Sequence, residues 1–237
     1  MEKSAAMDER AKLDERAAPP LAPEAIVELH DPAGLLVRWY CTPERLDELA
    51  AGWLVGEGRA VSAADIGPIG VDAASGRVEL EAPVADLRRT PAPAPGGPPR
   101  AGELVGTLTA NPGGLRALFQ AMFEGAALRE RTGGIHTGAL VERGQVRCVR
   151  EDVSRHCVVD KLIGQAALAG SGFDGTVILL SGRISGAIAA KAARAGVAAM
   201  ATMSIPTTLA AEIAGRAGMT LIGRARGAAP HVYPPGS

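Results

Sequence analysis

The C-terminal part of this sequence alternates short apolar segments with alanine-rich ones, and this alternation restricts the possible folds more than any other feature. The strand candidates TVILL, VAAMATMS and TLIGRARG are separated by AIAAKAARAG and PTTLAAEIAGRAG, whose composition favours helices. Gly196 and Gly218 follow the helical segments, where left-handed caps are expected, and Pro206 is expected to open the second helix. The pattern predicts a parallel βαβαβ unit, with a ligand crevice outside the carboxyl ends of its strands.

The residues nearer the N-terminus predict a smaller, β-rich part. AIVELH and LLVRWYCT flank the turn-rich tetrapeptide DPAG and indicate a hairpin, and IGVDAASGRVELEA indicates a second one. Between the two hairpins, Thr42, Pro43 and Glu44 have the order of a helix cap, a first helical residue and an acidic first turn. We expect a helix from there to about Gly56.

The middle of the chain predicts one amphipathic helix and a further hairpin. The helix has a single apolar stripe, formed by Leu115, Leu118, Phe119, Met122 and Phe123. The segment RTGGIHTGALVERGQVRCVRED then breaks at two glycines and alternates in the manner of a hairpin that turns near residues 142–144.

These patterns give a domain plan. Residues 1–20 mix charges with alanine and end near two prolines, so we expect a disordered tail. Residues 21–237 are expected to form one domain, with an N-terminal part over 21–87, a second part over 103–237, and a Pro/Gly-rich linker or loop over 88–102.

Composition narrows the classes of function. The formal net charge of -1 argues against sequence-independent nucleic-acid binding, although it permits a local basic pocket. The sequence has no apolar run of the roughly 18 residues that a spanning helix needs, and its N-terminus is charged. Three cysteines form no CxxC pair, which indicates reduced thiols. We therefore expect a cytoplasmic protein that binds neither membrane nor nucleic acid.

The stretch EDVSRHCVVDKLIG concentrates polar chemistry at the start of a predicted helix. Its apolar residues share one face, which must be core: Val158, Val159, Leu162, Ile163, Ala166 and Ala167. The polar residues then lie where free backbone N–H groups and the helix dipole attract anions, and Arg155 and His156 add to that attraction. Asp160 is placed to orient His156, or to pair with Lys161 or Arg155. The plainer interpretation is that Asp152 or Ser154 caps the helix and that the charges are solvated.

Repetition of this pattern favours a ligand site. RTGGIH, SGRIS and SIPTT also combine small residues with a hydroxyl or a guanidinium at predicted element boundaries. Each has a plainer interpretation as a turn, and His136 alone is more often structural. Four such segments together predict a site for a phosphate-bearing ligand.

Several common schemes are absent. The H-x-E and P-C-x-x-C elements of zinc deaminases are missing, so we expect no metal. No strand is followed by G-x-G-x-x-G, and there is no P-loop motif.

The ordered motifs CTPERLDELAAGWLVGEG, RTGGIHTGAL, EDVSRHCVVDKLIG, LLSGRIS, KAARAGVAAMATMSIPTTLA and LIGRARG with the closing HVY resemble the FdhD family of formate dehydrogenase accessory sulfurtransferases. The resemblance covers the chain from about Val27 to Tyr233. It implies an α/β, cytidine-deaminase-like fold, with a mixed sheet, flanking helices and an N-terminal β-hairpin/helix subdomain. It also implies a homodimer that binds the molybdenum cofactor as bis(molybdopterin guanine dinucleotide), for which GDP serves as a mimic.

By this resemblance, the protein takes sulfur from a cysteine desulfurase and delivers it to the cofactor before insertion into the formate dehydrogenase apoenzyme. The nucleotide-contacting turn maps onto residues 224–229, where Arg226 matches and Arg224 replaces a usual aromatic. The pterin end is expected near His136 and Asp152. The implied cofactor-binding residues are Thr132, Gly133, Gly134, His136, Asp152, Arg155, His156, Ser181, Gly182, Arg183, Ser204, Thr207, Arg224, Ala225, Arg226, Gly227, Ala228 and Ala229.

The sequence departs from the family at the sulfur-carrying step. The family's C-G-x-C-G loop corresponds to GTLTANPGGLRAL here, which is shorter and contains no cysteine. Cys157 is the candidate replacement, because a helix start beside Arg155 and His156 lowers a thiol pKa; Cys41 and Cys148 are expected to be inert. Three functions remain: a sulfurtransferase using an unconventional or a partner's thiol, a non-catalytic cofactor chaperone or regulator, and an enzyme acting on a free nucleotide through His136 or His156.

Overall fold

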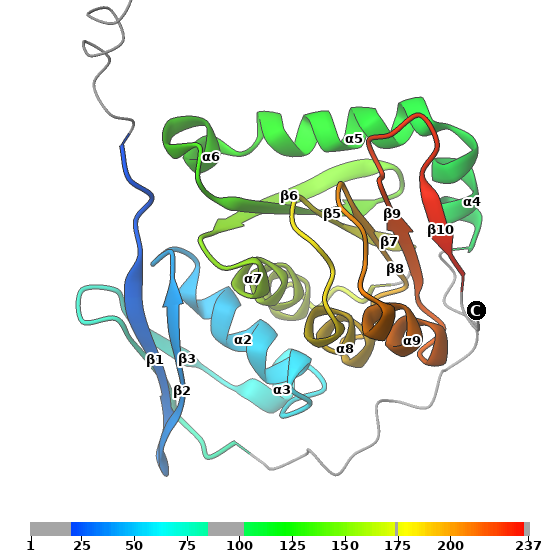
Figure 1. Cartoon of the computed structure of the whole chain (residues 1–237). Helices are drawn as coiled ribbons and strands as arrows, with labels where there is room; N and C mark the ends of the chain where they lie inside the picture. Colours follow the sequence, from blue (N-terminus) through cyan, green and yellow to red (C-terminus); the bar gives the residue numbers. More distant parts are fainter. Residues whose placement is uncertain (1–19, 85–101, 174, 235–237) are drawn as a thin grey trace, which may run out of the picture.

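The predicted βαβαβ unit forms the centre of the fold. In the computed structural model, which describes residues 20–84, 102–173 and 175–234, the three predicted strands lie parallel and side by side (Figure 1). The elements, in chain order, are β1 (Ala25–Asp31), β2 (Gly34–Cys41), α2 (Leu46–Gly56), α3 (Ala63–Ile66), β3 (Ile69–Asp72), β4 (Arg77–Leu80), α4 (Gly102–Ala110), α5 (Pro112–Glu124), α6 (Ala127–Thr132), β5 (His136–Glu142), β6 (Gln145–Asp152), α7 (Arg155–Leu168), β7 (Thr176–Leu180), α8 (Gly186–Arg194), β8 (Ala199–Thr202), α9 (Thr208–Arg216), β9 (Thr220–Gly223) and β10 (His231–Tyr233).

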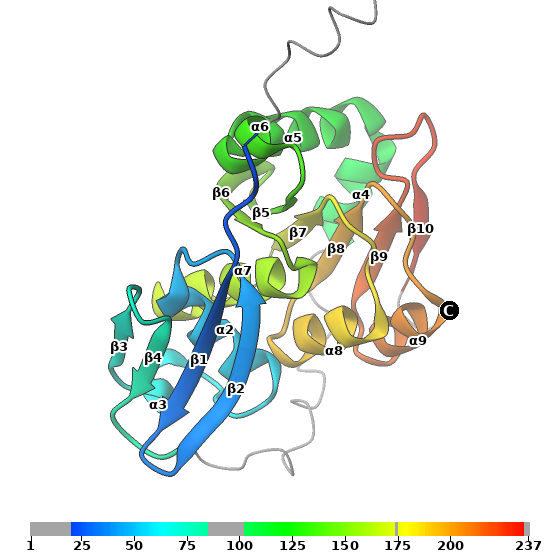
Figure 2. The ribbon, with the colours of Figure 1, turned by 60° about the vertical axis from the view of Figure 1, so that its left-hand side comes forward.

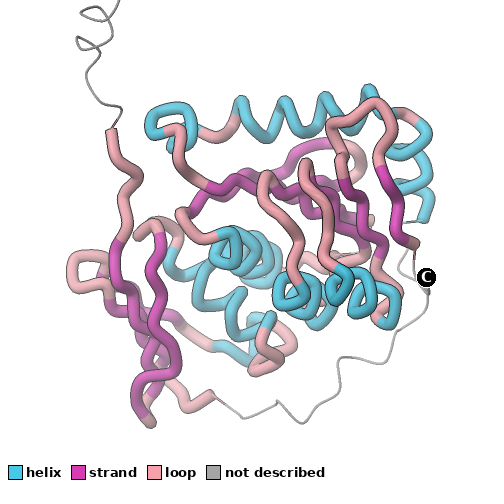
Figure 3. The backbone as a smooth tube through the Cα atoms, in the orientation of Figure 1, coloured by secondary structure: helices cyan, strands magenta, loops and turns pink. Residues whose placement is uncertain are grey.

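The main sheet is mixed, as expected. Its strand order is β10-β9-β8-β7-β5-β6, and the predicted hairpin β5–β6 joins the parallel strands in antiparallel fashion through β5. The helix α5 covers one face of this sheet, while α7, α8 and α9 cover the other (Figures 1 and 3). The apolar stripe predicted for α5 is the side of this helix that faces the sheet, and Leu115, Phe119 and Met122 are fully buried there.

The two predicted N-terminal hairpins combine into a second sheet. Its order is β2-β1-β4-β3, because β1 pairs with β4 in parallel and each hairpin is antiparallel within itself (Figure 2). One face of this sheet packs on α2, which in turn packs on α7. The N-terminal part therefore shares a continuous apolar core with the α7 side of the main sheet.

The contact between α2 and α7 brings two helix backbones together. A Cβ atom at Gly52 would lie 1.7 Å from the carbonyl oxygen of Asp160, and one at Gly164 would lie 1.8 Å from that of Glu48. Real Cβ atoms do not approach other atoms so closely, so both positions require glycine. As a result α7 is buried on all sides over residues 157–164, rather than on the one predicted face.

Two predicted helix starts are wrong by a few residues. The helix α2 begins at Leu46, after Arg45 in a left-handed conformation with φ of 55°, and Thr42 does not cap it. The helix α9 begins at Thr208; Thr207 is its N-cap and accepts a hydrogen bond from the N–H of Ala210, so Pro206 precedes the cap. The caps at Gly196 and Gly218 are confirmed, with φ values of 81° and 73°.

Parts of the domain plan lie outside the described residues. These are the expected tail over residues 1–20, except residue 20, and the expected linker over 88–102, except residue 102, where α4 begins. No helix of the described ranges is both long and apolar enough to span a membrane.

We predict that Gly52→Ala or Gly164→Ala destabilises the fold by about 3 kcal/mol or more, since the added methyl group must push the two helix backbones apart. The measurement is the free energy of unfolding in urea. Gly106→Ala is the control, because no described atom lies within 4 Å of a Cβ at this position in α4. Alanine favours the helix there by about 0.5 to 1 kcal/mol. Equal stability of all three variants would contradict the close crossing.

Candidate functional site

The four segments predicted to form a site lie together at one edge of the main sheet. Ser181, after β7, exchanges hydrogen bonds with Thr137 near the start of β5: its N–H donates to the Thr137 oxygen (2.9 Å) and its Oγ accepts from the Thr137 N–H (2.9 Å). Thr202 Oγ1, at the end of β8, donates to the Gly182 oxygen (2.7 Å), and the Thr202 oxygen accepts from the N–H of Ala225 (2.9 Å). Direct hydrogen bonds thus connect the ends of β7, β8 and β9 with the start of β5.

The start of α7 belongs to the same edge. A Cβ at Gly182 would lie 3.1 Å from His136 Nδ1 and 3.5 Å from the Cβ of Arg155, so these three residues are neighbours. Ser154 caps α7, and its hydroxyl accepts from the N–H of Cys157 at 3.5 Å. Of the two caps considered, Ser154 is therefore the one used. We call this region the crevice: His136, Arg155, Ser181, Gly182, Ser204 and the residues next to them.

Exposure divides the predicted residues into three groups. Thr132, His136, Arg155, His156, Ser181, Gly182, Ser204, Thr207 and Gly227 are half-buried; Gly133, Gly134, Arg183, Arg224, Arg226, Ala228 and Ala229 are exposed; and Asp152 and Ala225 are buried. A ligand can therefore reach most of the set, but not the side chains of the last two.

Asp152 has a structural role rather than the predicted contact with a ligand. Its carboxylate is fully buried and lies 2.7 Å from Nζ of Lys161, which is 1% exposed. It also accepts from the N–H groups of Ser154 (2.8 Å) and Thr42 (3.2 Å). Lys161 in turn donates to the Thr42 oxygen at 3.0 Å. Asp152 therefore ties the N-terminal part to the start of α7 and is occupied by protein partners.

Asp160 pairs with none of the three partners considered for it, His156, Lys161 and Arg155. Asp160 pairs instead with Lys191 of α8, whose Nζ lies 2.7 and 2.9 Å from its two carboxylate oxygens. Burial lowers the pKa of His156, and the positive charges of Lys191 and Arg155 lower it further. Burial, then Arg155, also lowers the pKa of His136. Both imidazoles thus favour the neutral form, so Arg155 supplies the positive charge here and His156 does not add to it.

The prediction of a low thiol pKa at Cys157 is also wrong. Cys157 is 3% exposed, and burial, followed by the charge of Asp152, raises its pKa to about 12. The same two causes raise the pKa of Cys41 to about 12, and burial raises that of Cys148. The favourable effect of a helix start on a thiolate is smaller than this loss of solvation, so the pKa rises. None of the three cysteines in the sequence therefore forms a thiolate readily near neutral pH.

The segment that corresponds to the family's cysteine loop, GTLTANPGGLRAL, is helical except at one residue. Asn111 alone separates α4 from α5, and its side chain accepts from the N–H of Gly114 at 3.1 Å as the cap of α5. The segment therefore forms a tight corner between two helices.

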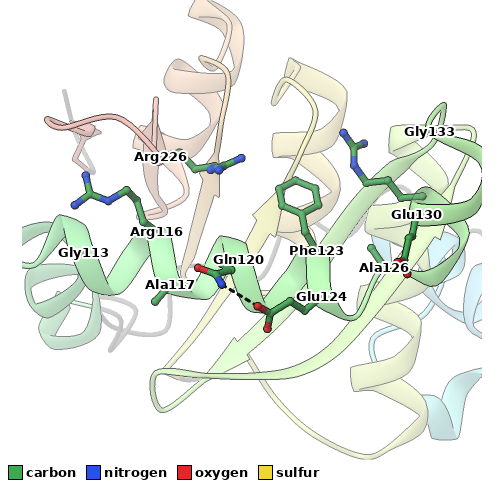
Figure 4. Close-up of a pocket in the computed structure, with 11 residues that line it drawn as sticks. Gly113, Arg116, Ala117, Gln120, Phe123, Glu124, Ala126, Glu130, Gly133 and Arg226 are labelled. Atoms are coloured by element: carbon green, nitrogen blue, oxygen red, sulfur yellow. Dashed lines mark hydrogen bonds between the residues drawn. The ribbon is translucent and has the colours of Figure 1, made fainter.

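A pocket of about 1030 Å³ opens beside the crevice, on the α5 and α6 side of the sheet. Three arginines from different elements line it: Arg116 of α5, Arg129 of α6 and Arg226 of the turn after β9. The guanidinium of Arg129 lies 4.9 Å from the ring centre of Phe123, and that of Arg226 lies 5.8 Å from it. Figure 4 shows Arg226 extending toward Phe123 and Arg116 farther along α5. We call this feature the arginine pocket.

Sequence reasoning found only part of this pocket. Gly133 and Arg226 were predicted, whereas Arg116, Phe123 and Arg129 were not assigned to a site. Phe123 belongs to the predicted apolar stripe, and no role was predicted for the polar side of α5. The signal that was available is an Arg-x₃-Gln-x₂-Phe spacing, which puts Arg116, Gln120 and Phe123 on one side of the helix.

The crevice also contains polar atoms without partners. Among the described residues, three buried side-chain atoms make no hydrogen bond: Thr137 Oγ1, Arg155 Nε and Ser185 Oγ. Buried polar groups are normally paired. In the described part of the chain, no group of three or more His, Cys, Asp or Glu side chains is placed to hold a metal ion.

The family model described as FdhD/NarQ matches residues 24–236. The chain belongs to the FdhD/NarQ family. It is 33% identical to "Sulfur carrier protein FdhD" of Methanothermobacter thermautotrophicus over 233 residues, which cover 95% of this chain and 92% of that protein. It is 31% identical to the protein of the same name from Geobacillus kaustophilus, covering 81% of this chain and 80% of the relative.

A solved structure has the same fold. The crystal structure is described as that of a formate dehydrogenase accessory protein from Desulfotalea psychrophila, and it matches with a TM-score of 0.72 and 24% identity. The match covers 90% of this chain and 87% of that one. The expected α/β fold with a mixed sheet and flanking helices is confirmed.

We predict that Ellman's reagent does not label Cys41 or Cys157 of the native protein within minutes at pH 8, since with a pKa of about 12 only about one thiol in ten thousand is ionised. In denaturing urea, all three cysteines should react at once. Rapid labelling of Cys41 or Cys157 in the native protein would contradict the burial described for these two thiols.

Proposed function

We propose that this FdhD/NarQ protein is a formate dehydrogenase accessory protein that binds the guanine-nucleotide form of the molybdenum cofactor as cargo. The observation that carries the proposal is the arginine pocket, which lies beside the crevice and is lined by three arginines from separate elements. The names of the relatives support the assignment to formate dehydrogenase maturation and to sulfur delivery.

The pocket has the chemistry of a diphosphate site. Guanidinium groups bind phosphate oxygens through paired, charge-assisted hydrogen bonds. Phe123 holds two of the three in place through cation–π contacts, which reduces the entropy lost when a phosphate binds. With three arginines and the two carboxylates of Glu124 and Glu130, the lining has a formal charge of +1. The carboxylates are acceptors for the ring N–H and amino group of a guanine.

The pocket is large enough to take a nucleotide. Its volume of about 1030 Å³ is just above the range of roughly 300 to 1,000 Å³ for small-molecule sites. The remainder of a larger ligand then extends along the crevice. There, the buried Arg155 Nε at the start of α7 has no hydrogen-bond partner.

The sulfur step is proposed to use a thiol from outside this chain. A persulfide carrier needs an accessible, ionisable thiol, whereas Cys41 and Cys157 are buried and have a pKa of about 12. A cysteine desulfurase or a cysteine-bearing relative supplies the sulfur in this scheme. The present chain holds the cargo and passes it to the apoenzyme, as a chaperone does, and a homodimer provides two such sites.

We predict that GDP raises the melting temperature of the protein, because a ligand that binds only the folded state stabilises it. Arg116→Ala or Arg226→Ala should weaken GDP binding about tenfold each, through loss of a charge-assisted hydrogen bond. Isothermal titration calorimetry measures the affinities. Arg147→Ala is the control, since Arg147 pairs with Glu142 at the far end of the β5–β6 hairpin. No binding of GDP at millimolar concentration by the wild-type protein would refute the proposed site.

We predict that a variant in which all three cysteines are replaced by alanine still supports formate dehydrogenase activity in a strain that lacks this chain. In the proposed scheme the sulfur comes from a thiol outside this chain, so none of these three cysteines is needed as a carrier. Each single Cys→Ala variant checks whether any loss of activity comes from weakened packing, and unfolding curves of all four proteins provide the comparison. Loss of activity in a stably folded triple variant would restore a carrier role to one of these cysteines.

A further inference from the structure

Two acidic side chains at the end of β6, Glu151 and Asp152, point to opposite faces of the main sheet. Successive strand residues alternate in direction, and Asp152 points toward α7, where Lys161 binds it. Glu151 points to the other face, toward α6. Its carboxylate accepts the N–H of Leu128 at 2.9 Å through one oxygen and the N–H of Arg129 at 2.7 Å through the other.

These two hydrogen bonds replace a local cap on α6. The N-cap residue of this short helix is Ala126, which has no side chain able to accept a hydrogen bond. The carboxylate is instead that of Glu151 in β6, which lies 23 positions after Leu128 and 22 positions after Arg129 in the sequence. A helix start leaves its first N–H groups unpaired, and a carboxylate there is favoured by charge as well. Glu151 therefore fixes the start of α6 against the sheet.

The helix fixed in this way carries Arg129 into the arginine pocket. The backbone of Arg129 is bound by Glu151, while its guanidinium donates to the Ile135 oxygen at 2.9 Å and lies over Phe123. A tilt of α6 would move the guanidinium away from Phe123 and from the other two arginines. The position of this charge therefore depends on a carboxylate that does not itself line the pocket.

We propose that Glu151 is a positioning residue of the arginine pocket: it anchors the start of α6 and so places the Arg129 guanidinium where a phosphate binds. The phosphate part of this inference rests on the proposed function. The anchoring also connects the two faces of the sheet, since the Glu151 carbonyl oxygen accepts from Lys161 Nζ at 3.3 Å and Lys161 pairs with Asp152. One dipeptide at the end of β6 thus orients both the pocket and the crevice.

The informative variant is Glu151→Gln, which keeps the size of the side chain. A glutamine has a single oxygen acceptor, and its NH₂ group would face the second backbone N–H, so one of the two hydrogen bonds is lost. We expect hydrogen exchange in the free protein to become faster at the Leu128 and Arg129 amides, with α5 and α7 unchanged. Unchanged exchange at α6 would overturn the anchoring, whether or not the protein binds a nucleotide.

The functional part is tested by a double-mutant cycle with GDP as the probe. We expect Glu151→Gln and Arg129→Ala each to weaken GDP binding about tenfold, and the double variant to be no weaker than Arg129→Ala alone, because Glu151 acts through Arg129. Additive losses of about a hundredfold would show that Glu151 affects binding by another route and would overturn the proposal. A residue that only stabilised the fold would not produce this non-additivity.

Glu142→Gln serves as the matched control, since Glu142 lies at the other end of the same hairpin and pairs with Arg147. It should change neither GDP affinity nor exchange in α6. If the wild-type protein fails to bind GDP while exchange in α6 responds to Glu151→Gln, the proposed function fails and the anchoring stands.

Discussion

The contact between the backbones of α2 and α7 is the constraint on which the rest of this structure depends. Two glycines remove the side chains that would otherwise separate these helices, and the approach leaves α7 without a solvent-exposed side over most of its length. Charged residues on such a helix must find partners inside the protein. Lys161 and Asp160 do so with Asp152 and Lys191, which come from β6 and α8. Because of this close packing, Asp160 and Lys161 are not solvated on a polar helix face. They form buried ion pairs that connect α7 to α8 and to β6.

This constraint explains which parts of the fold were predictable from the sequence. The βαβαβ unit, the three hairpins and the apolar stripe of α5 follow from short-range periodicity and turn residues, and all are present. The pairing of β1 with β4 and the burial of α7 were not predicted, since they depend on contacts between distant residues. Thr42 is an example: its position in the sequence suggests a cap for the next helix. In the structure its N–H instead donates to Asp152, and its carbonyl oxygen accepts from Lys161.

The candidate site, too, was predicted from the sequence only in part. The crevice follows from the rule that ligands meet the carboxyl ends of parallel strands, and the four predicted segments do come together there. Two of the three arginines of the arginine pocket were missed, because Arg116 and Arg129 come from separate helices and neither was part of a predicted site. Cys157 was misjudged because a helix start suggests an activated thiol, whereas burial has the larger effect on its pKa and acts in the opposite direction.

The single residue between α4 and α5 bears on the rate at which sulfur can reach the cargo. A thiol carried on a loop of the same chain is present at an effective concentration on the order of millimolar, independent of how much protein a cell makes. Asn111 leaves no chain length for such a loop at this corner. In the proposed scheme, sulfur arrival becomes a second-order encounter, so the flux through this protein rises and falls with the abundance of its donor.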